Sequence, residues 1–360
     1  MSELELARAE ITRIDEEMAR LFEQRMQAVS HVADYKRANG LPIRDTAREE
    51  ALLARCRGLI GDPDVEGLYV EFLRKVIDVS CQYQARLIQG RSVAYSGVEG
   101  AYAHIAARKL FPESACRGYA SFEAAYRAVE SGECDCAVLP LENSYAGEVG
   151  TVMDLLFTGS LFVNQIMDLP VLHGLMACPG AKIEDIRTVY SHPQALSQCA
   201  AFIRSHGWKT VECANTALAA QQVRNLNDPS AAAIASEETA ELYGLSLLES
   251  RISDAAGNAT RFAVLSRTQN RPVRHGMKDT AGFILVFTVQ NKAGALAQTL
   301  NIIGAHGYNM KALRSRPMKD LQWNYYFYVE AEGNVANENG EMLMRELGAL
   351  CARLKLVGIY

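Results

Sequence analysis

Three cations lie on what should be the buried face of a long N-terminal helix. Apolar residues recur there every three to four positions from Leu4 onward, as on the core-facing stripe of an amphipathic helix. Arg8, Arg25 and Lys36 fall on the same stripe. Because Arg and Lys are rarely buried without a partner, this stripe favours a binding site for a small anion. The alternative is that these side chains extend to the edge of the face or pair with an acid such as Asp15.

The spacing of the three cations bears on how many chains form such a site. With a rise of about 1.5 Å per residue, Lys36 is about 16 Å from Arg25 along the helix axis, and Arg8 is about 25 Å from Arg25 in the other direction. Arg25 and Lys36 could reach one small molecule, but Arg8 of the same chain could not. If all three bind one ligand, Arg8 comes from a second, antiparallel chain, which predicts a helical dimer with two equivalent sites.

The next two predicted helices add polar groups at helical spacing. Asp45, Arg48 and Glu49 lie close together at the start of one helix, and Ser80 and Gln84 are four residues apart on the apolar face of the other. The first group could equally be a solvated surface, and the second a hydrogen-bonded core pair.

In order and spacing these residues resemble the all-helical class of chorismate mutases, over the whole of residues 1–90. The resemblance implies that Arg25 and Arg8 of the partner subunit hold the two substrate carboxylates. It also implies that Lys36 and Gln84 donate hydrogen bonds to the ether oxygen of chorismate. The remaining polar lining would be Asp45, Arg48, Glu49 and Ser80. The rearrangement is unimolecular, so fixed cations that hold a compact conformer and stabilise charge on the breaking C–O bond meet its needs.

Three polar clusters mark the ends of predicted strands in the middle of the chain. They are Pro140–Ser144, Tyr190–Gln194 together with Gln198, and Asn258–Phe262. Strand ends line ligand crevices in α/β sheets, so the clusters favour one shared site. Each has a structural alternative: Asn143-Ser144 or Ser191 could cap a following helix, and Arg261 could form a surface ion pair.

The Glu-Asn-Ser, Tyr-Ser-His-Pro-Gln and Thr-Arg-Phe motifs of these clusters resemble the prephenate dehydratase family over residues 91–268. The resemblance implies that Thr260 assists departure of the ring hydroxyl and that Arg261 binds a substrate carboxylate. The residues that orient prephenate would be Glu142, Asn143, Ser144, Ser191 and Gln198. Loss of water and carbon dioxide creates an aromatic ring, so a hydrogen bond to the leaving hydroxyl is a sufficient catalytic device. We expect His104 and His192 to be structural.

A pair of motifs near the C-terminus resembles a regulatory module. Asn291–Leu296 and the later Arg314-Ser315-Arg316-Pro317 are similar to the small amino-acid-binding ACT family on bifunctional mutase–dehydratases. The resemblance implies a paired domain that binds phenylalanine near Gly294, Ala295, Leu296, Arg314, Ser315, Arg316 and Pro317. Family members usually carry Glu where this chain has Arg314, which reverses a charge beside the ligand. A dimerisation domain without a ligand is the alternative.

The elements that position these residues fall into three segments, which predicts a multidomain protein. Residues 1–90 read as an all-α domain, with helices over about 5–38, 45–59 and 64–88. In residues 91–268 short apolar runs alternate with helical stretches, which predicts an α/β domain. The resemblance to prephenate dehydratases implies that this domain has two lobes around a cleft. A polar linker, Thr268–Asp279, leads to residues 280–360, whose β-α-β-β-α-β pattern predicts an α+β ferredoxin-like unit.

The composition, 49% hydrophobic and 22% charged, is typical of a soluble globular protein. The acidic N-terminus is unlike a secretory signal, and no stretch approaches the roughly 20 apolar residues that span a bilayer. Nine scattered cysteines indicate reduced thiols and a cytoplasmic protein. A net charge of −5 argues against nucleic-acid binding. Without nucleotide or zinc motifs, we expect no cofactor and no metal, only the substrates chorismate and prephenate, with phenylalanine as effector.

Two other classes of protein remain open. A mutase–dehydrogenase would need a glycine-rich dinucleotide loop, which the sequence lacks. A non-enzymatic solute-binding regulator would explain the middle and terminal segments but not the cations on the first helix. Formation of phenylpyruvate from chorismate without added cofactor separates a mutase–dehydratase from both.

Overall fold

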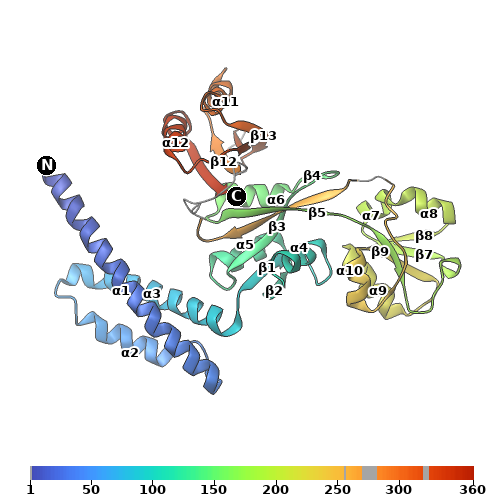
Figure 1. Cartoon of the computed structure of the whole chain (residues 1–360), viewed down its shortest axis with the longest axis horizontal. Coiled ribbons are helices and arrows are strands. Elements are labelled where there is room, and N and C mark those ends of the chain that lie inside the picture. The colour runs from blue at the N-terminus through green and yellow to red at the C-terminus, as the bar shows by residue number, and fades with distance from the viewer. Residues whose placement is uncertain (1, 255–256, 270–281, 319–323) are drawn as a thin grey trace. The chain divides into compact units, whose positions relative to one another are not determined.

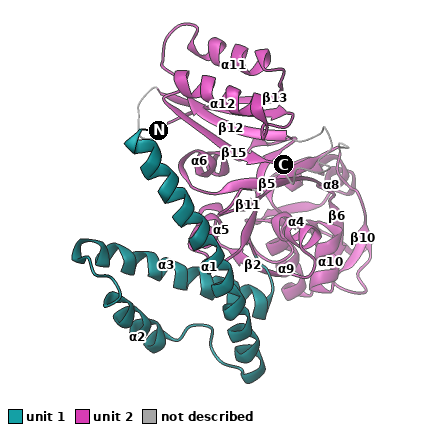
Figure 2. Ribbon diagram, turned by 60° about the vertical axis from the view of Figure 1, so that its left-hand side comes forward, with its two compact units in different colours: residues 1–92 teal, residues 93–360 magenta. Residues whose placement is uncertain are grey.

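Figure 1 shows the computed structural model, which describes residues 2–254, 257–269, 282–318 and 324–360. The chain divides into two units, residues 1–92 and residues 93–360 (Figure 2). The predicted linker Thr268–Asp279 lies for the most part outside the described residues.

The first unit is three helices, as predicted. They are α1 (Glu3–Asn39), α2 (Thr46–Arg57) and α3 (Pro63–Gln89). Local chemistry sets their ends: Ser2 forms a capping box with Glu5, Asp45 caps α2, and Gly40 ends α1 in the left-handed conformation with φ 62°.

The core of the first unit is small and lies between α2 and α3. It consists of Leu53, Cys56, Val70, Leu73 and Ile77. Of the 37 residues of α1, only Ala33 is buried, and its apolar stripe is open: Leu4 and Ile11 are 58% and 57% exposed, and Phe22 is 43% exposed. Such a row of exposed large apolar side chains is typical of a surface that another chain covers.

The second unit contains two sheets, which confirms the α/β class predicted for the middle segment. The part of the larger sheet that comes from this segment has the order β5-β11-β3-β1-β2, with β4 on β3. Its elements are β1 (Ser92–Ser96), α4 (Tyr102–Leu110), β2 (Ala115–Tyr119), α5 (Phe122–Glu130), β3 (Cys136–Asn143), β4 (Gly147–Glu148), α6 (Gly150–Thr158), β5 (Phe162–Pro170) and β11 (Ala259–Ser266).

The smaller sheet has the order β10-β6-β9-β7-β8. Its elements are β6 (Gly174–Ala177), the 3-10 turn η1 (Ile183–Asp185), β7 (Thr188–Ser191), α7 (Pro193–Gln198), α8 (Ala200–His206), β8 (Lys209–Glu212), α9 (Thr216–Leu226), β9 (Ala231–Ala235), α10 (Glu237–Tyr243) and β10 (Ser246–Glu249). The central strand β9 is wholly buried, and parallel β7 and β9 bring their carboxyl ends to one edge.

The C-terminal segment has the predicted β-α-β-β-α-β order. Its elements are β12 (Gly282–Thr288), α11 (Ala295–Ala305), β13 (Asn309–Pro317), β14 (Tyr325–Glu332), α12 (Glu338–Leu350) and β15 (Arg353–Ile359). Their sheet order, β13-β14-β12-β15, places the buried β12 between β14 and β15. This is a ferredoxin-like arrangement.

The C-terminal segment joins the larger sheet through β15, where Gly358 pairs with Val163 of β5. A Cβ atom on Gly358 would lie 2.2 Å from the Val163 carbonyl oxygen, so this close approach requires glycine. Helix α6 packs nearby: the Phe157 ring stacks on Tyr326 of β14 with centroids 4.3 Å apart.

Candidate functional sites

In the first unit, α1 and α3 bring a cation and two polar side chains together. The Arg25 guanidinium donates a hydrogen bond to the Ser80 hydroxyl, which in turn donates to the Val76 carbonyl at 2.6 Å. One turn later the Gln84 amide donates to the Ser80 carbonyl at 3.4 Å. Gln84 is buried, and its Oε1 atom has no partner within the described residues. A buried acceptor without a partner destabilises the fold, and such acceptors often belong to functional sites.

A second group of polar residues lies where α2 approaches α3. Glu49 contacts Arg44 at 3.5 Å and the Cys81 thiol at 3.7 Å, and Arg44 also pairs with Asp78. The hydrogen bond that Arg44 donates to Asp78 raises the pKa of the Arg44 guanidinium. Arg44 was not among the predicted site residues, although it lies next to Asp45.

The other predicted residues of this unit take different places. The Lys36 ammonium donates to the Ile43 carbonyl just before α2. Asp45 accepts from the Arg48 backbone at 3.1 Å and so is a helix cap, while the Arg48 side chain is exposed. Arg8 is exposed near the start of α1, about 25 Å along the axis from Arg25 at about 1.5 Å per residue.

In the second unit, Asn143, Gln198 and Thr260 line one cavity of about 340 Å³. Asn143 makes several hydrogen bonds at this cavity. Its Nδ2 atom donates to Thr260 Oγ1 and to Asn258 Oδ1, each at 2.9 Å. Its Oδ1 atom accepts from the backbone of Tyr145 and Ala146 at 3.0 Å. Because Asn143 occupies an acceptor position of Thr260, the threonine hydroxyl keeps its own proton to donate into the cavity.

Tyr102 and His173 also line the cavity, although neither was predicted as a site residue, and Asn258 of the third predicted cluster lies beside them. The His173 ring contacts the Tyr102 hydroxyl at 3.2 Å through Nδ1 and Gln198 Oε1 at 2.9 Å through Nε2. Asn258 donates to the same Gln198 oxygen at 3.1 Å. Burial lowers the pKa of His173 and raises that of Tyr102. Only Asn258, which lies two residues before the Thr-Arg-Phe motif, carried a sequence signal.

The cavity contains donors suited to an anion. The Gln198 Nε2 atom is buried and lacks a partner within the described residues. The first turns of α4, at Ala101 and Tyr102, and of α9, at Asn215 and Thr216, also line the cavity. No side chain caps α4. Backbone N–H groups at helix N-termini favour carboxylates.

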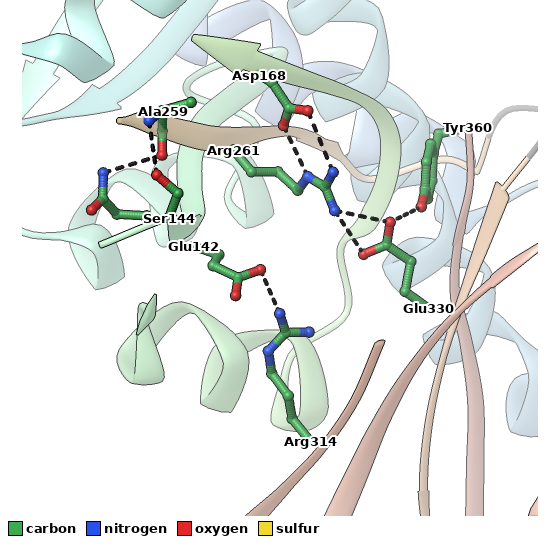
Figure 3. A network of polar contacts seen from close by, with 9 residues as sticks. Glu142, Ser144, Asp168, Ala259, Arg261, Arg314, Glu330 and Tyr360 are labelled. Atoms are coloured by element: carbon green, nitrogen blue, oxygen red, sulfur yellow. Dashed lines mark hydrogen bonds and ion pairs between the residues drawn. The ribbon is translucent and has the colours of Figure 1, made fainter. Parts of the chain in front are cut away.

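Ser191 and Ser144 do not line this cavity. Ser191 is fully buried and donates to the Ile234 carbonyl at 2.6 Å. Ser144 accepts from the Ala259 backbone at 3.0 Å and donates to Gly257 (Figure 3). The capping alternatives for both clusters were wrong, because His192 caps α7 and Val149 is at the N-cap of α6. As expected, His104 has a structural contact, accepting from the Gly100 backbone at 3.1 Å.

Glu142 and Arg261 also lie outside the cavity lining and pair with charged residues (Figure 3). Arg261 forms ion pairs with Asp168 at 2.9 Å and Glu330 at 3.2 Å, so the ion-pair alternative is confirmed, although one partner is buried. Glu142 pairs with Arg314 of β13.

The predicted regulatory residues lie on α11 and β13. Gly294 is the left-handed N-cap of α11, and Ala295 and Leu296 open that helix. On β13, Ser315 and Pro317 are exposed, and Arg316 pairs with Glu148 at 2.6 Å and Asp154 at 3.0 Å.

In the described part of the chain, every helix is too short or too polar to span a membrane. Nor do three or more His, Cys, Asp or Glu side chains gather there as they would around a metal ion.

Family models match two stretches of this chain. The model for chorismate mutase type II matches residues 7–85, and the model for prephenate dehydratase matches residues 93–270. The bifunctional chorismate mutase/prephenate dehydratase of Enterobacter agglomerans is 33% identical over 98% of this chain and 94% of its own length. The protein of the same name from Escherichia coli K12 is 31% identical over 98% of this chain and 95% of its own.

Solved structures resemble about three quarters of the chain. Prephenate dehydratase from Arthrobacter aurescens in complex with L-Phe is 26% identical, with a TM-score of 0.68, over 75% of this chain and 89% of that one. An enzyme described as a novel type of quorum quenching acylase is 31% identical, also with a TM-score of 0.68, over 75% of this chain and 97% of its own.

Proposed function

This chain belongs to the bifunctional chorismate mutase/prephenate dehydratases, and on that premise we propose which of its side chains carry each reaction. The protein rearranges chorismate to prephenate and then converts prephenate to phenylpyruvate, two consecutive steps of phenylalanine biosynthesis. We assign the mutase to residues 1–90, the dehydratase to residues 91–268 and regulation to residues 280–360.

For the mutase, Arg25 and Lys36 bind and polarise chorismate, with Ser80 and Gln84 beside them. The contact between Arg25 and Ser80 supports this grouping, because it aims the guanidinium at the face of α3 that carries Gln84. In this proposal Gln84 and Lys36 donate to the ether oxygen on which negative charge develops. Asp45, Arg48 and Glu49 complete the polar lining from α2, and Arg44 helps to hold Glu49.

We further propose that the mutase works as a homodimer. Arg8 is too far from Arg25 to reach the same small molecule within one chain. The open apolar stripe of α1 gives a second chain a surface to cover. In an antiparallel pairing, Arg8 of the partner subunit would supply the second carboxylate contact.

For the dehydratase, the observation that carries the proposal is the hydrogen bond from Asn143 to Thr260 in the lined cavity. It leaves the threonine proton directed to a ligand, where it assists departure of the ring hydroxyl. The carboxylates of prephenate are held by Gln198 and by the first turns of α4 and α9. As carbon dioxide leaves, the electrons of the broken C–C bond move into the ring and expel the hydroxyl. The hydroxyl takes up one proton, relayed from solvent through the Thr260 hydroxyl, and leaves as water, and the ring becomes aromatic.

Replacing Thr260 with Val tests this assignment, because Val keeps the shape of the side chain and removes the hydroxyl. We expect conversion of prephenate to fall by roughly 10²- to 10³-fold, the usual cost of losing a hydrogen bond that forms in the transition state. Thr260→Ser should retain most of the activity. Near wild-type turnover of prephenate by Thr260→Val would overturn the assignment.

For residues 280–360 we propose an ACT-type regulatory domain that binds phenylalanine. The β-α-β-β-α-β order supports it, as does the similarity to a prephenate dehydratase whose structure holds L-Phe. The binding residues would lie around Gly294, Ala295 and Leu296 on α11 and Ser315 and Pro317 on β13. A domain that only dimerises would instead give no heat in a calorimetric titration with phenylalanine.

A further inference from the structure

Neighbouring residues on β3 and β11 face opposite sides of the sheet. The two strands are antiparallel, with Asn143 opposite Thr260 and Glu142 opposite Arg261. Since side chains alternate along a strand, each pair occupies one face. Asn143 and Thr260 line the cavity, whereas Glu142 and Arg261 contact the C-terminal segment.

Carboxylates of the protein occupy all three nitrogens of the Arg261 guanidinium (Figure 3). Nε and Nη2 donate to Asp168 of β5 at 2.9 and 3.4 Å, and Nη1 donates to Glu330 of β14 at 3.2 Å. The Glu330 side chain is only 4% exposed and also accepts from the Tyr360 hydroxyl at 2.5 Å. Arg261 is therefore held from both sides.

Glu142 has a matching partner on β13. The Arg314 guanidinium donates to the Glu142 carboxylate, lies 3.7 Å from Glu148, and sits over the Tyr328 ring at 5.6 Å. With its side chain only 18% exposed, Arg314 is packed against the dehydratase segment and does not point into solvent. Arg314 thus contacts β3 and Glu330 contacts the neighbouring strand β11, at two residues that lie opposite each other in the sheet.

The ladder between these strands is irregular at this place. Its register shifts between Arg261 and Phe262, so Phe262 faces Pro140 and Leu141 is left out of the pairing. A bulge of this kind weakens the local hydrogen bonding and re-aims the side chains beside it. The backbone that orients Thr260 and Asn143 accordingly needs support from elsewhere.

We propose that Arg314 and Glu330 are positioning residues of the dehydratase site, holding Thr260 and Asn143 in register through Glu142 and Arg261. The C-terminal segment then forms part of the structure that makes the cavity active. The inference rests on the dehydratase assignment above. It also gives Arg261 and Glu142 a role different from direct contact with prephenate.

The test compares Arg314→Met and Glu330→Gln with a matched control, Lys311→Met. Lys311 lies on the same strand as Arg314 and pairs with Glu332 at 2.8 Å, but both partners are about half exposed and the pair does not involve β3 or β11. Full-length proteins are assayed with prephenate for kcat and KM, and with chorismate for mutase activity. The mutase serves as an internal measure of correctly folded chain.

Loss of register should lower kcat, because misplacement of a catalytic group by about 1 Å costs up to 10²-fold. We expect kcat for prephenate to fall about tenfold or more in Arg314→Met and Glu330→Gln, with KM within about twofold and mutase activity unchanged. Lys311→Met should match the wild type. Arg314→Lys, which keeps the charge, should recover most of kcat.

Two results would overturn the inference. One is an unchanged kcat in both variants, and the other is a rise in KM at constant kcat, which would mean that these charges act on substrate binding. If Arg314→Met fails to fold, Arg314→Lys and Glu330→Gln decide by the same criteria. Failure of the dehydratase assignment is distinguishable, since Thr260→Val would then remain active whatever Arg314 does.

Discussion

At the scale of single residues, hydrogen bonds in the dehydratase cavity orient the hydroxyl of Thr260, which is a weak acid. Thr260 is oriented by Asn143, and Asn143 is oriented by the backbone of Tyr145 and Ala146. The chain thus fixes a proton donor with neutral groups alone. His173 supports the same network through its contact with Gln198.

Burial of His173 should make the folded chain less stable as the pH falls. Burial lowers its pKa in the folded chain below the usual value of about 6.5. Between that lowered pKa and about 6.5 the unfolded chain binds a proton that the folded chain does not, so the free energy of unfolding decreases as the pH falls. In urea unfolding at several pH values, the advantage of wild type over His173→Gln should shrink below about pH 6.5. An advantage that is constant or grows toward acid pH would contradict this.

Residue types predicted part of the site. Thr260, Asn143 and Gln198 were found because polar residues interrupt apolar runs at strand ends, and all three line the cavity. His173 and Arg44 were missed, because a lone histidine and one more arginine carry no pattern. Their partners, Gln198 and Asp78, come from elsewhere in the chain.

At the scale of elements, local chemistry determined the ends of helices and non-local contacts determined the faces of strands. Helices α1, α2 and α3 begin and end within two residues of the predicted positions. The placement of Glu142 and Asn143 on opposite faces of the sheet could not be predicted from the sequence. It depends on the pairing of β3 with β11 and on the charged partners from β13 and β14.

The junction between β15 and β5 should be sensitive to one methyl group. In Gly358→Ala the new Cβ would meet the Val163 carbonyl oxygen at 2.2 Å, so the strands must separate, at a cost of about 1–3 kcal/mol. Gly348→Ala in α12 is the control: nothing lies within 4 Å, and alanine should stabilise the helix by about 0.5–1 kcal/mol. The thermal unfolding temperature should fall in Gly358→Ala and rise in Gly348→Ala. Equal unfolding temperatures would show that the close approach at Gly358 tolerates a Cβ atom.

At the scale of the whole molecule, the first unit leaves the apolar face of its longest helix open. Its longest helix buries one residue, while Leu4, Ile11 and Phe22 stay open. The spacing of Arg8, Arg25 and Lys36 predicted a two-chain site from helix geometry alone. The size of the core could not be predicted in this way, because it depends on how the three helices pack.

Mixing two inactive variants tests the shared mutase site. Arg8→Ala and Arg25→Ala should each lack most mutase activity. After exchange of subunits, each mixed dimer has one site with both changes and one intact site, so roughly a quarter of the wild-type activity should return in an equimolar mixture. Mixed dimers that form but remain inactive would rule out a site built from two chains.

The central claim is that one chain carries two consecutive reactions at separate sites. It is tested most directly by following chorismate and prephenate at neutral pH, without cofactor, in Lys36→Ala, in Thr260→Val and in their mixture. Lys36→Ala should convert prephenate but not chorismate, and Thr260→Val should accumulate prephenate from chorismate, because the two sites belong to different units and act independently. The mixture should form phenylpyruvate from chorismate. Loss of both reactions in either folded variant, or phenylpyruvate formed at the wild-type rate by Thr260→Val alone, would contradict the account.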